Sequence, residues 1–146
     1  MFRLVLFFIF STVCISIELP SNAVSLDEVV DAAFQVEDNV LTIYIHKKRK
    51  GYLSMGLGED MDQGDIFIIE LKKGELEFIN CITIGHKNPV CAEDNQTWTL
   101  VDSELNDNGT WKAVVSRNMV DETNGLRVSQ GINYMMLSYS DDDNHF

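Results

Sequence analysis

Met61 is the residue whose type and surroundings most suggest unusual chemistry. It stands between Asp60 and Asp62 in a glycine-rich turn, within the segment GYLSMGLGEDMDQGDIFIIE at 51–70. A methionine between two carboxylates contributes little to a hydrophobic core. Its thioether therefore either covers an irregular gap at the end of the fold or faces a group that binds a soft sulfur ligand.

Few other side chains are suited to catalysis, because the chain has only three histidines, His46, His86 and His145. The sequence contains no Gly-x-Ser-x-Gly elbow, no His-Glu-x-x-His helix, no phosphate-binding glycine loop and no paired-cysteine zinc signature. A calcium loop framed on Glu59 also fails, because its third position is Met61, which offers no hard oxygen. We therefore expect a binding or carrier protein and not an enzyme.

The first 23 residues predict a cleaved signal peptide. Arg3 precedes an apolar stretch from Leu4 to Ile17, and Ser21 and Ala23 stand at the minus-three and minus-one positions of a cleavage site. The apolar stretch is shorter than the roughly 20 residues of a spanning helix, and an uncleaved signal anchor is the alternative. We expect a secreted or luminal protein, with residues 24–146 as the mature chain and no membrane span within it.

Composition and charge narrow the class of protein. A chain of 146 residues, 45% of them hydrophobic, suits one compact domain. The formal net charge of −12 argues against partners such as nucleic acid and anionic lipid surfaces. The basic run HKKRK at 46–50 predicts a solvated hairpin tip, with docking to an acidic partner as the alternative. The acidic tail DDDNHF at 141–146 predicts a solvated chain end.

Covalent features fit an oxidising compartment. Cys81 and Cys91 are the two cysteines that remain once the leader is removed, and they predict a disulfide, with two buried thiols as the alternative. The triplets Asn95-Gln-Thr97 and Asn108-Gly-Thr110 predict N-glycosylation at Asn95 and Asn108 in polar, solvent-exposed stretches.

The elements that position these residues are predicted to be strands, because β-branched and aromatic residues recur in short runs bounded by Gly, Asn, Asp or Pro. The runs cover 40–46, 65–71, 76–84, 97–101, 110–116 and 132–139. Turn sequences at 72–75, 107–109 and 121–125 join antiparallel neighbours. The segment 25–34 is the one candidate for a helix, and a strand is its alternative. The pattern predicts an all-β fold, an antiparallel β-sandwich.

Taken in order, these segments resemble the DOMON domain family. GYLSMGLGEDMDQGDIFII at 51–69 is similar to the family's glycine, aromatic residue, apolar alternation, methionine-bearing loop and acidic residue that opens a strand. NPVCAEDNQTWTLV at 88–101 and NGTWKAVVSRNMV at 108–120, with Arg117 and Met119, are similar to its later motifs. The resemblance covers roughly residues 33–145 and departs from the family where its usual tryptophan is Tyr52. It implies an immunoglobulin-like β-sandwich that binds a ligand.

The ligand that the resemblance implies first is haem b. In the haem-binding members the iron is held by a methionine of this loop and a histidine near the C-terminal end, positions occupied here by Met61 and His145. A thioether–imidazole iron carries one electron at a raised potential, so this hypothesis also implies a redox partner protein. His86 is a substitute imidazole if its loop folds inward. Trp98 and Trp111 are expected in the core, or lining an apolar ligand pocket.

Two further hypotheses stand beside electron transfer. The same fold could serve as a non-haem binding module for a sugar or a small apolar ligand. It could also be an extracellular adhesion or interaction domain. In both cases Met61 covers the end of the sandwich and His145 is a solvated residue of the tail.

Overall fold

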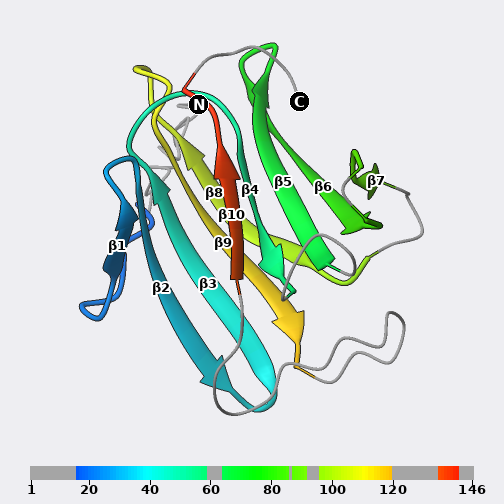
Figure 1. The fold of residues 1–146 in the computed structure, drawn as a ribbon. Coiled ribbons are helices and arrows are strands. Elements are labelled where there is room, and N and C mark those ends of the chain that lie inside the picture. The colour runs from blue at the N-terminus through cyan, green and yellow to red at the C-terminus, as the bar shows by residue number, and fades with distance from the viewer. Residues whose placement is uncertain (1–15, 59–63, 86, 92–95, 120–134, 142–146) are drawn as a thin grey trace, which may run out of the picture.

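The computed structural model describes residues 16–58, 64–85, 87–91, 96–119 and 135–141, and every regular element in these ranges is a strand. The strands form two antiparallel five-stranded sheets that face each other (Figure 1). The predicted all-β antiparallel sandwich is therefore confirmed. None of the described residues forms a helix long and apolar enough to cross a membrane.

The first sheet, sheet A, has the strand order β1-β2-β3-β9-β8. Its members are β1 (Val24–Asp27), β2 (Val30–Glu37), β3 (Val40–Lys47), β9 (Trp111–Asn118) and β8 (Thr99–Leu105). The helix candidate at 25–34 is thus divided between β1 and β2. A two-residue turn joins β2 to β3, in which Asp38 and Asn39 both have positive φ, 49° and 63°. Asp and Asn tolerate this conformation, and the resulting turn matches the right-handed twist of the hairpin.

The second sheet, sheet B, has the strand order β10-β4-β5-β6-β7. Its members are β10 (Met135–Tyr139), β4 (Leu53–Leu57), β5 (Gly64–Lys72), β6 (Glu75–Thr83) and β7 (Val90–Cys91). The predicted turn at 72–75 is present, with positive φ at Lys73 and Gly74. The predicted turn at 121–125 lies outside the described residues.

The hydrophobic core lies between the two sheets, where alternate residues of each strand point inward. Trp98 and Trp111 are both buried in it, as predicted. The rings of Phe67 and Trp98 meet edge to face, with centroids 5.0 Å apart. Both tryptophans are thus members of the core cluster between the sheets.

Sheet B is also apolar on its outer face, which points away from sheet A. Ile66, Ile68 and Cys81 are buried there in a second cluster, with Ile79 and Met136 packed against them. Every residue of β5 from Gly64 to Glu70 is buried in consequence. A strand buried on both faces is unusual for the antiparallel sheet of a two-layer sandwich, whose outer face normally meets solvent.

The basic run at 46–50 is not a hairpin tip, because it carries the chain from β3 in sheet A to β4 in sheet B. Lys47 is fully buried, and its ammonium lies 3.1 Å from Oδ1 of Asp141 and over the ring of Tyr139. Arg49 contacts the other carboxylate oxygen of Asp141 at 2.9 Å. The solvated interpretation was therefore wrong for Lys47, and Asp141 anchors the start of the acidic tail.

Candidate functional site

Four of the sequence-predicted site residues, Met61, His145, His86 and Asn95, lie outside the described residues. Their described neighbours in the chain still restrict where they can reach. In the sequence Met61 falls between Gly58, the residue after β4, and Gly64, the first residue of β5.

His145 follows β10, and β10 ends at the opposite end of the sheet. The two strands are antiparallel, with Met135 beside Leu57 and Tyr139 beside Leu53. Gly58 and Asp141 are thus about seven residues apart along the strand direction, which at about 3.3 Å per residue is about 23 Å. The described residues nearest to Met61 and to His145 in the chain therefore lie at opposite ends of sheet B.

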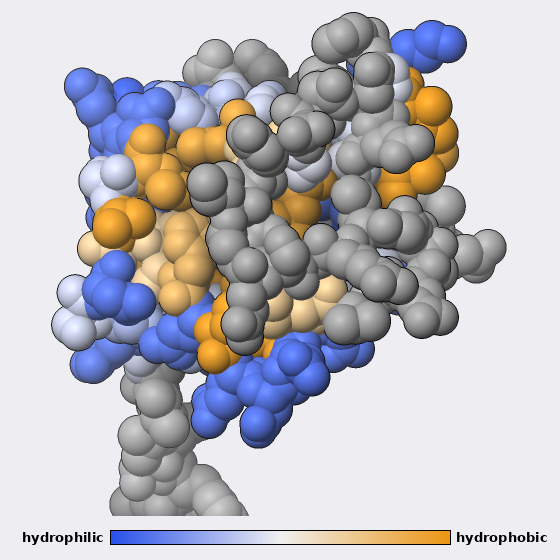
Figure 2. Space-filling view, turned by 60° about the horizontal axis from the view of Figure 1, so that its bottom comes forward, coloured by the Kyte–Doolittle hydropathy of each residue, from blue (hydrophilic) through white to orange (hydrophobic). Residues whose placement is uncertain are grey.

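An apolar pocket of about 390 Å³ lies on the outer face of sheet B. We call it the β10 pocket. It is lined by Ser54, Ile66, Thr83, Lys87, Asn88, Pro89, Met136, Leu137 and Ser138. Ile66 and Met136 belong to the second apolar cluster, and residues 87–89 form the polar side. Figure 2, in which the bottom of Figure 1 is turned forward, shows hydrophobic residues over the left and centre of this side and hydrophilic residues along its lower edge.

Met136 lies against Gly64, where a side chain would not fit. A Cβ on Gly64 would come within 2.2 Å of the Met136 Cε atom and 2.5 Å of the Thr83 Oγ1 atom. The Gly64 N–H donates a hydrogen bond to that hydroxyl at 2.6 Å. The thioether of Met136 therefore lies beside the start of β5, next to the loop that carries Met61.

His86 also neighbours the β10 pocket in the chain. Lys87 lines the pocket, and its N–H donates a hydrogen bond to the Gly85 carbonyl at 2.9 Å. Position 86 is thus one residue from the lining, and position 61 is three residues from Gly64. The described lining contains one thioether and no imidazole, and no metal-binding group of His, Cys, Asp and Glu occurs among the residues the structure describes. The described residues alone do not make a haem site.

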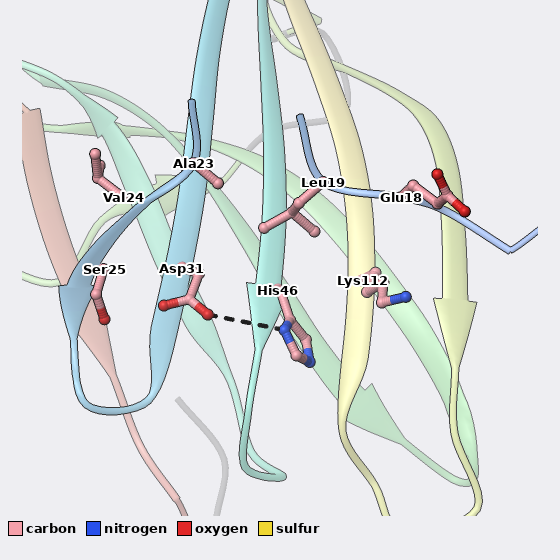
Figure 3. Close-up of a pocket in the computed structure, with 8 residues that line it drawn as sticks. All are labelled: Glu18, Leu19, Ala23, Val24, Ser25, Asp31, His46 and Lys112. Carbon is pink, nitrogen blue, oxygen red and sulfur yellow. Dashed lines mark ion pairs between the residues drawn. The ribbon is translucent and has the colours of Figure 1, made fainter. Parts of the chain in front are cut away.

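A second, polar pocket of about 710 Å³ lies on the outer face of sheet A (Figure 3). Four residues cross that face in register, from Asp31 through His46 and Lys112 to Glu104. The segment before β1 passes over this row and contributes Glu18 and Leu19 to the pocket wall (Figure 3).

The charged side chains around the polar pocket are largely paired with one another. Lys48 donates a hydrogen bond to Asp31 at 2.8 Å, which lowers the pKa of that carboxyl. His46 lies 4.0 Å from Asp31, but burial outweighs this carboxylate and lowers the histidine pKa. His46 is therefore neutral at neutral pH, and the row is a paired polar surface. This pairing favours a structural role for His46.

Two charged residues from separate sequence motifs meet in the core. The Arg117 guanidinium pairs with the Asp65 carboxylate, and both side chains are 0% exposed. Thr97 donates a hydrogen bond to the same carboxylate at 2.7 Å, and the Trp98 ring lies 5.2 Å from the guanidinium carbon. The arrangement is closed to solvent and ties β5 in sheet B to β9 in sheet A.

The predicted disulfide is present between Cys81 and Cys91, and it joins β6 to β7. Asn108 lies in the exposed turn before β9, where its side-chain oxygen accepts hydrogen bonds from the N–H and hydroxyl of Thr110. Its position leaves the predicted glycosylation sterically accessible.

Comparison with known proteins gives no family assignment. No family model and no curated protein matches the chain. Among solved structures the fold is similar to the cytochrome domain of the cellobiose dehydrogenase of Myriococcum thermophilum, with 12% identity and a TM-score of 0.49. The match covers 75% of this chain and 72% of that domain.

Proposed function

We propose that this protein is a secreted binding module that holds a small, largely apolar ligand in the β10 pocket. One observation carries the proposal. The outer face of sheet B, which in a two-layer sandwich normally meets water, is apolar and hollowed by a pocket of about 390 Å³. This volume lies in the range of small-molecule sites, about 300–1,000 Å³.

The lining suggests the chemistry of the ligand. Ile66, Met136 and Leu137 supply apolar contact, and Lys87 at the rim is the one charged residue of the described lining. A ligand with an apolar body and one acidic group would match this arrangement. The described lining pairs no hydroxyl or amine with a histidine or carboxylate, so we propose binding without chemical turnover.

Anilinonaphthalene sulfonate, an aromatic probe with one acidic group, is expected to bind the full secreted protein at a single site. Ser138→Trp should weaken this binding at least tenfold, because the indole would fill a pocket whose wall includes Ser138. Lys87→Gln should weaken it about fivefold through loss of a charge-assisted contact. Fluorescence titration measures both effects.

Ser103→Trp is the matched control, because Ser103 is an exposed residue of β8 on the other sheet. It should bind the probe as the unchanged protein does. A protein that does not bind the probe, or equal binding by the Ser138→Trp variant, would contradict the proposal.

Haem b is a second candidate ligand, and a specific observation favours it. The Met136 thioether lines the β10 pocket, Gly64 at three residues after Met61 lies against Met136, and Lys87 directly after His86 lines the pocket. We propose that, if haem is bound, Met61 supplies the thioether and His86 the imidazole, since His145 follows from the far end of β10. Bound haem would supply one-electron chemistry, and a redox partner would then be required.

Absorption spectra of the full protein, secreted from cells supplied with haem, test this candidate. In a haem protein, sharp reduced α and β bands should appear with dithionite and be lost in Met61→Ala. Loss in His86→Ala, with retention in His145→Ala, would support the ligand pair proposed here, and the reverse would support His145. If the protein stays colourless after haem titration, haem is excluded as the ligand and the small apolar ligand remains the proposal.

A further inference from the structure

The segment before β1 is held firmly on the outer face of sheet A. The Ile17 N–H donates a hydrogen bond to Oε2 of Glu104 at 2.9 Å, and Lys112 donates one to the Ile17 carbonyl at 2.8 Å. Glu104 and Lys112 are cross-strand partners in β8 and β9. The Ile17 side chain is only 8% exposed. Ile17 is therefore packed as a residue of the folded domain.

Cleavage after Ala23 would discard these contacts. It would remove Ile17 from its buried position and take Glu18 and Leu19 from the wall of the polar pocket (Figure 3). It would also remove the hydrogen bond from the Ala23 N–H to the Pro20 carbonyl, which turns the chain into β1.

An earlier peptide bond meets the same cleavage rule. Cys14 and Ser16 are small residues at the minus-three and minus-one positions of the Ser16–Ile17 bond. The apolar run from Leu4 to Val13 is then the hydrophobic part of the leader, within the usual length of about 7–15 residues. Sequence rules therefore permit both bonds, and the packing of Ile17 distinguishes them.

We propose that the export endopeptidase hydrolyses the Ser16–Ile17 bond and that the new α-ammonium group of Ile17 pairs with Glu104. Water adds across the peptide C–N bond: the carboxylate stays on Ser16, and the amine of Ile17 takes up a proton. The nitrogen that becomes charged already lies 2.9 Å from the carboxylate. The cut thus replaces a neutral donor to the Glu104 carboxylate by a charged one, which makes the stronger interaction.

The groups around the new terminus favour this pairing. The hydrogen bond from the Ile17 N–H is the largest cause that lowers the pKa of the Glu104 carboxyl, so Glu104 is ionised at neutral pH. The Ser16 hydroxyl, which donates to Glu104 at 3.0 Å, would leave with the leader and free a carboxylate oxygen for the new ammonium group. Lys112 faces it from β9, and His46, the next residue across from β3, is neutral at neutral pH. Glu104 would then lie between two cations, the Lys112 ammonium and the α-ammonium of Ile17.

N-terminal sequencing of the secreted full-length product tests the site of cleavage. We expect the mature chain to begin at Ile17. Ala23→Arg should leave that terminus unchanged, whereas Ser16→Arg should block cleavage there, because each substitution places a large residue at minus one of only one candidate bond. A mature chain that begins at Val24 or at any other residue would overturn the proposal, as would a terminus that changes only in Ala23→Arg.

Thermal unfolding of the processed protein tests the ion pair separately. An α-amino group has an ordinary pKa of about 8, and pairing with a carboxylate raises it. Its stabilising effect is present below pH 8 and is lost as the pH rises through the raised pKa. The unchanged protein should therefore lose more melting temperature between pH 7 and pH 9.5 than Glu104→Gln, whereas Asp102→Asn, a control in the same strand, should behave like the unchanged protein. Equal losses for the unchanged protein and Glu104→Gln would overturn the pairing.

Discussion

Replacing Asp65 with alanine is expected to lower the free energy of unfolding by about 3–5 kcal/mol. The Asp65 carboxylate is the buried partner of Arg117, and neither side chain is exposed to solvent. Removing it would take a buried ion-pair partner from Arg117 and the carboxylate that accepts the hydrogen bond of the Thr97 hydroxyl. Denaturant unfolding followed by tryptophan fluorescence measures the change, since Trp98 lies beside the pair.

A double-mutant cycle measures the interaction free energy between Asp65 and Arg117 separately from their other contacts. Arg117→Met alone should cost a similar amount, because it takes the guanidinium away from the buried Asp65 carboxylate. Asp65→Leu combined with Arg117→Met should cost much less than the sum of Asp65→Leu and Arg117→Met measured singly, since the double change removes both charges of the pair. Additive costs in the cycle would contradict this account of the pair.

Removing the disulfide is the prediction with the next largest effect. The bond joins cysteines separated by ten residues in sequence, for which the loss of chain entropy predicts a cost of about 2.7 kcal/mol. The suitable variant is Cys81→Ala with Cys91→Ser, because Cys81 is fully buried and Cys91 is exposed. Denaturant midpoints should fall accordingly, and m-values report whether the two-state transition is kept.

Reduction provides the control for this variant. Dithiothreitol should lower the stability of the unchanged protein to about that of the double variant, and should leave the double variant unaffected. A midpoint of the unchanged protein that stays the same after thiol titration shows the bond to be reduced would contradict the predicted cost.

Strands with one solvated face could be predicted from the sequence, because their side chains alternate between core and water. This holds for β3, whose residues alternate between buried and partly exposed along its whole length. Alternation was not enough for β4, which was not predicted as a strand although Leu53, Met55 and Leu57 alternate with Ser54 and Gly56. The run is only five residues long and holds none of the β-branched or aromatic residues that marked the predicted strands.

Contacts between distant parts of the chain account for the other differences. From its neighbours in the sequence Lys47 was predicted to be a solvated cation. Its partner Asp141 lies 94 residues further along the chain, so the local sequence does not show the ion pair. The place of Met136 in a pocket was likewise not predicted, because a strand pattern does not show whether its outer face is covered. Asp65 and Arg117, quoted from two motifs of the resemblance, do meet in the structure. The ligands that the resemblance implies, Met61 and His145, remain predictions.

The short strand β7 has a consequence for self-association. Sheet B ends at this strand, which pairs only Val90 and Cys91 with β6. The disulfide therefore holds β7 against the backbone of Ile82 and Cys81 at the end of β6. An uncovered β-strand edge is a template for pairing with another chain. Reduction is therefore expected to expose the backbone of Cys81 and Ile82 at the edge of β6 and to make pairing with another chain easier.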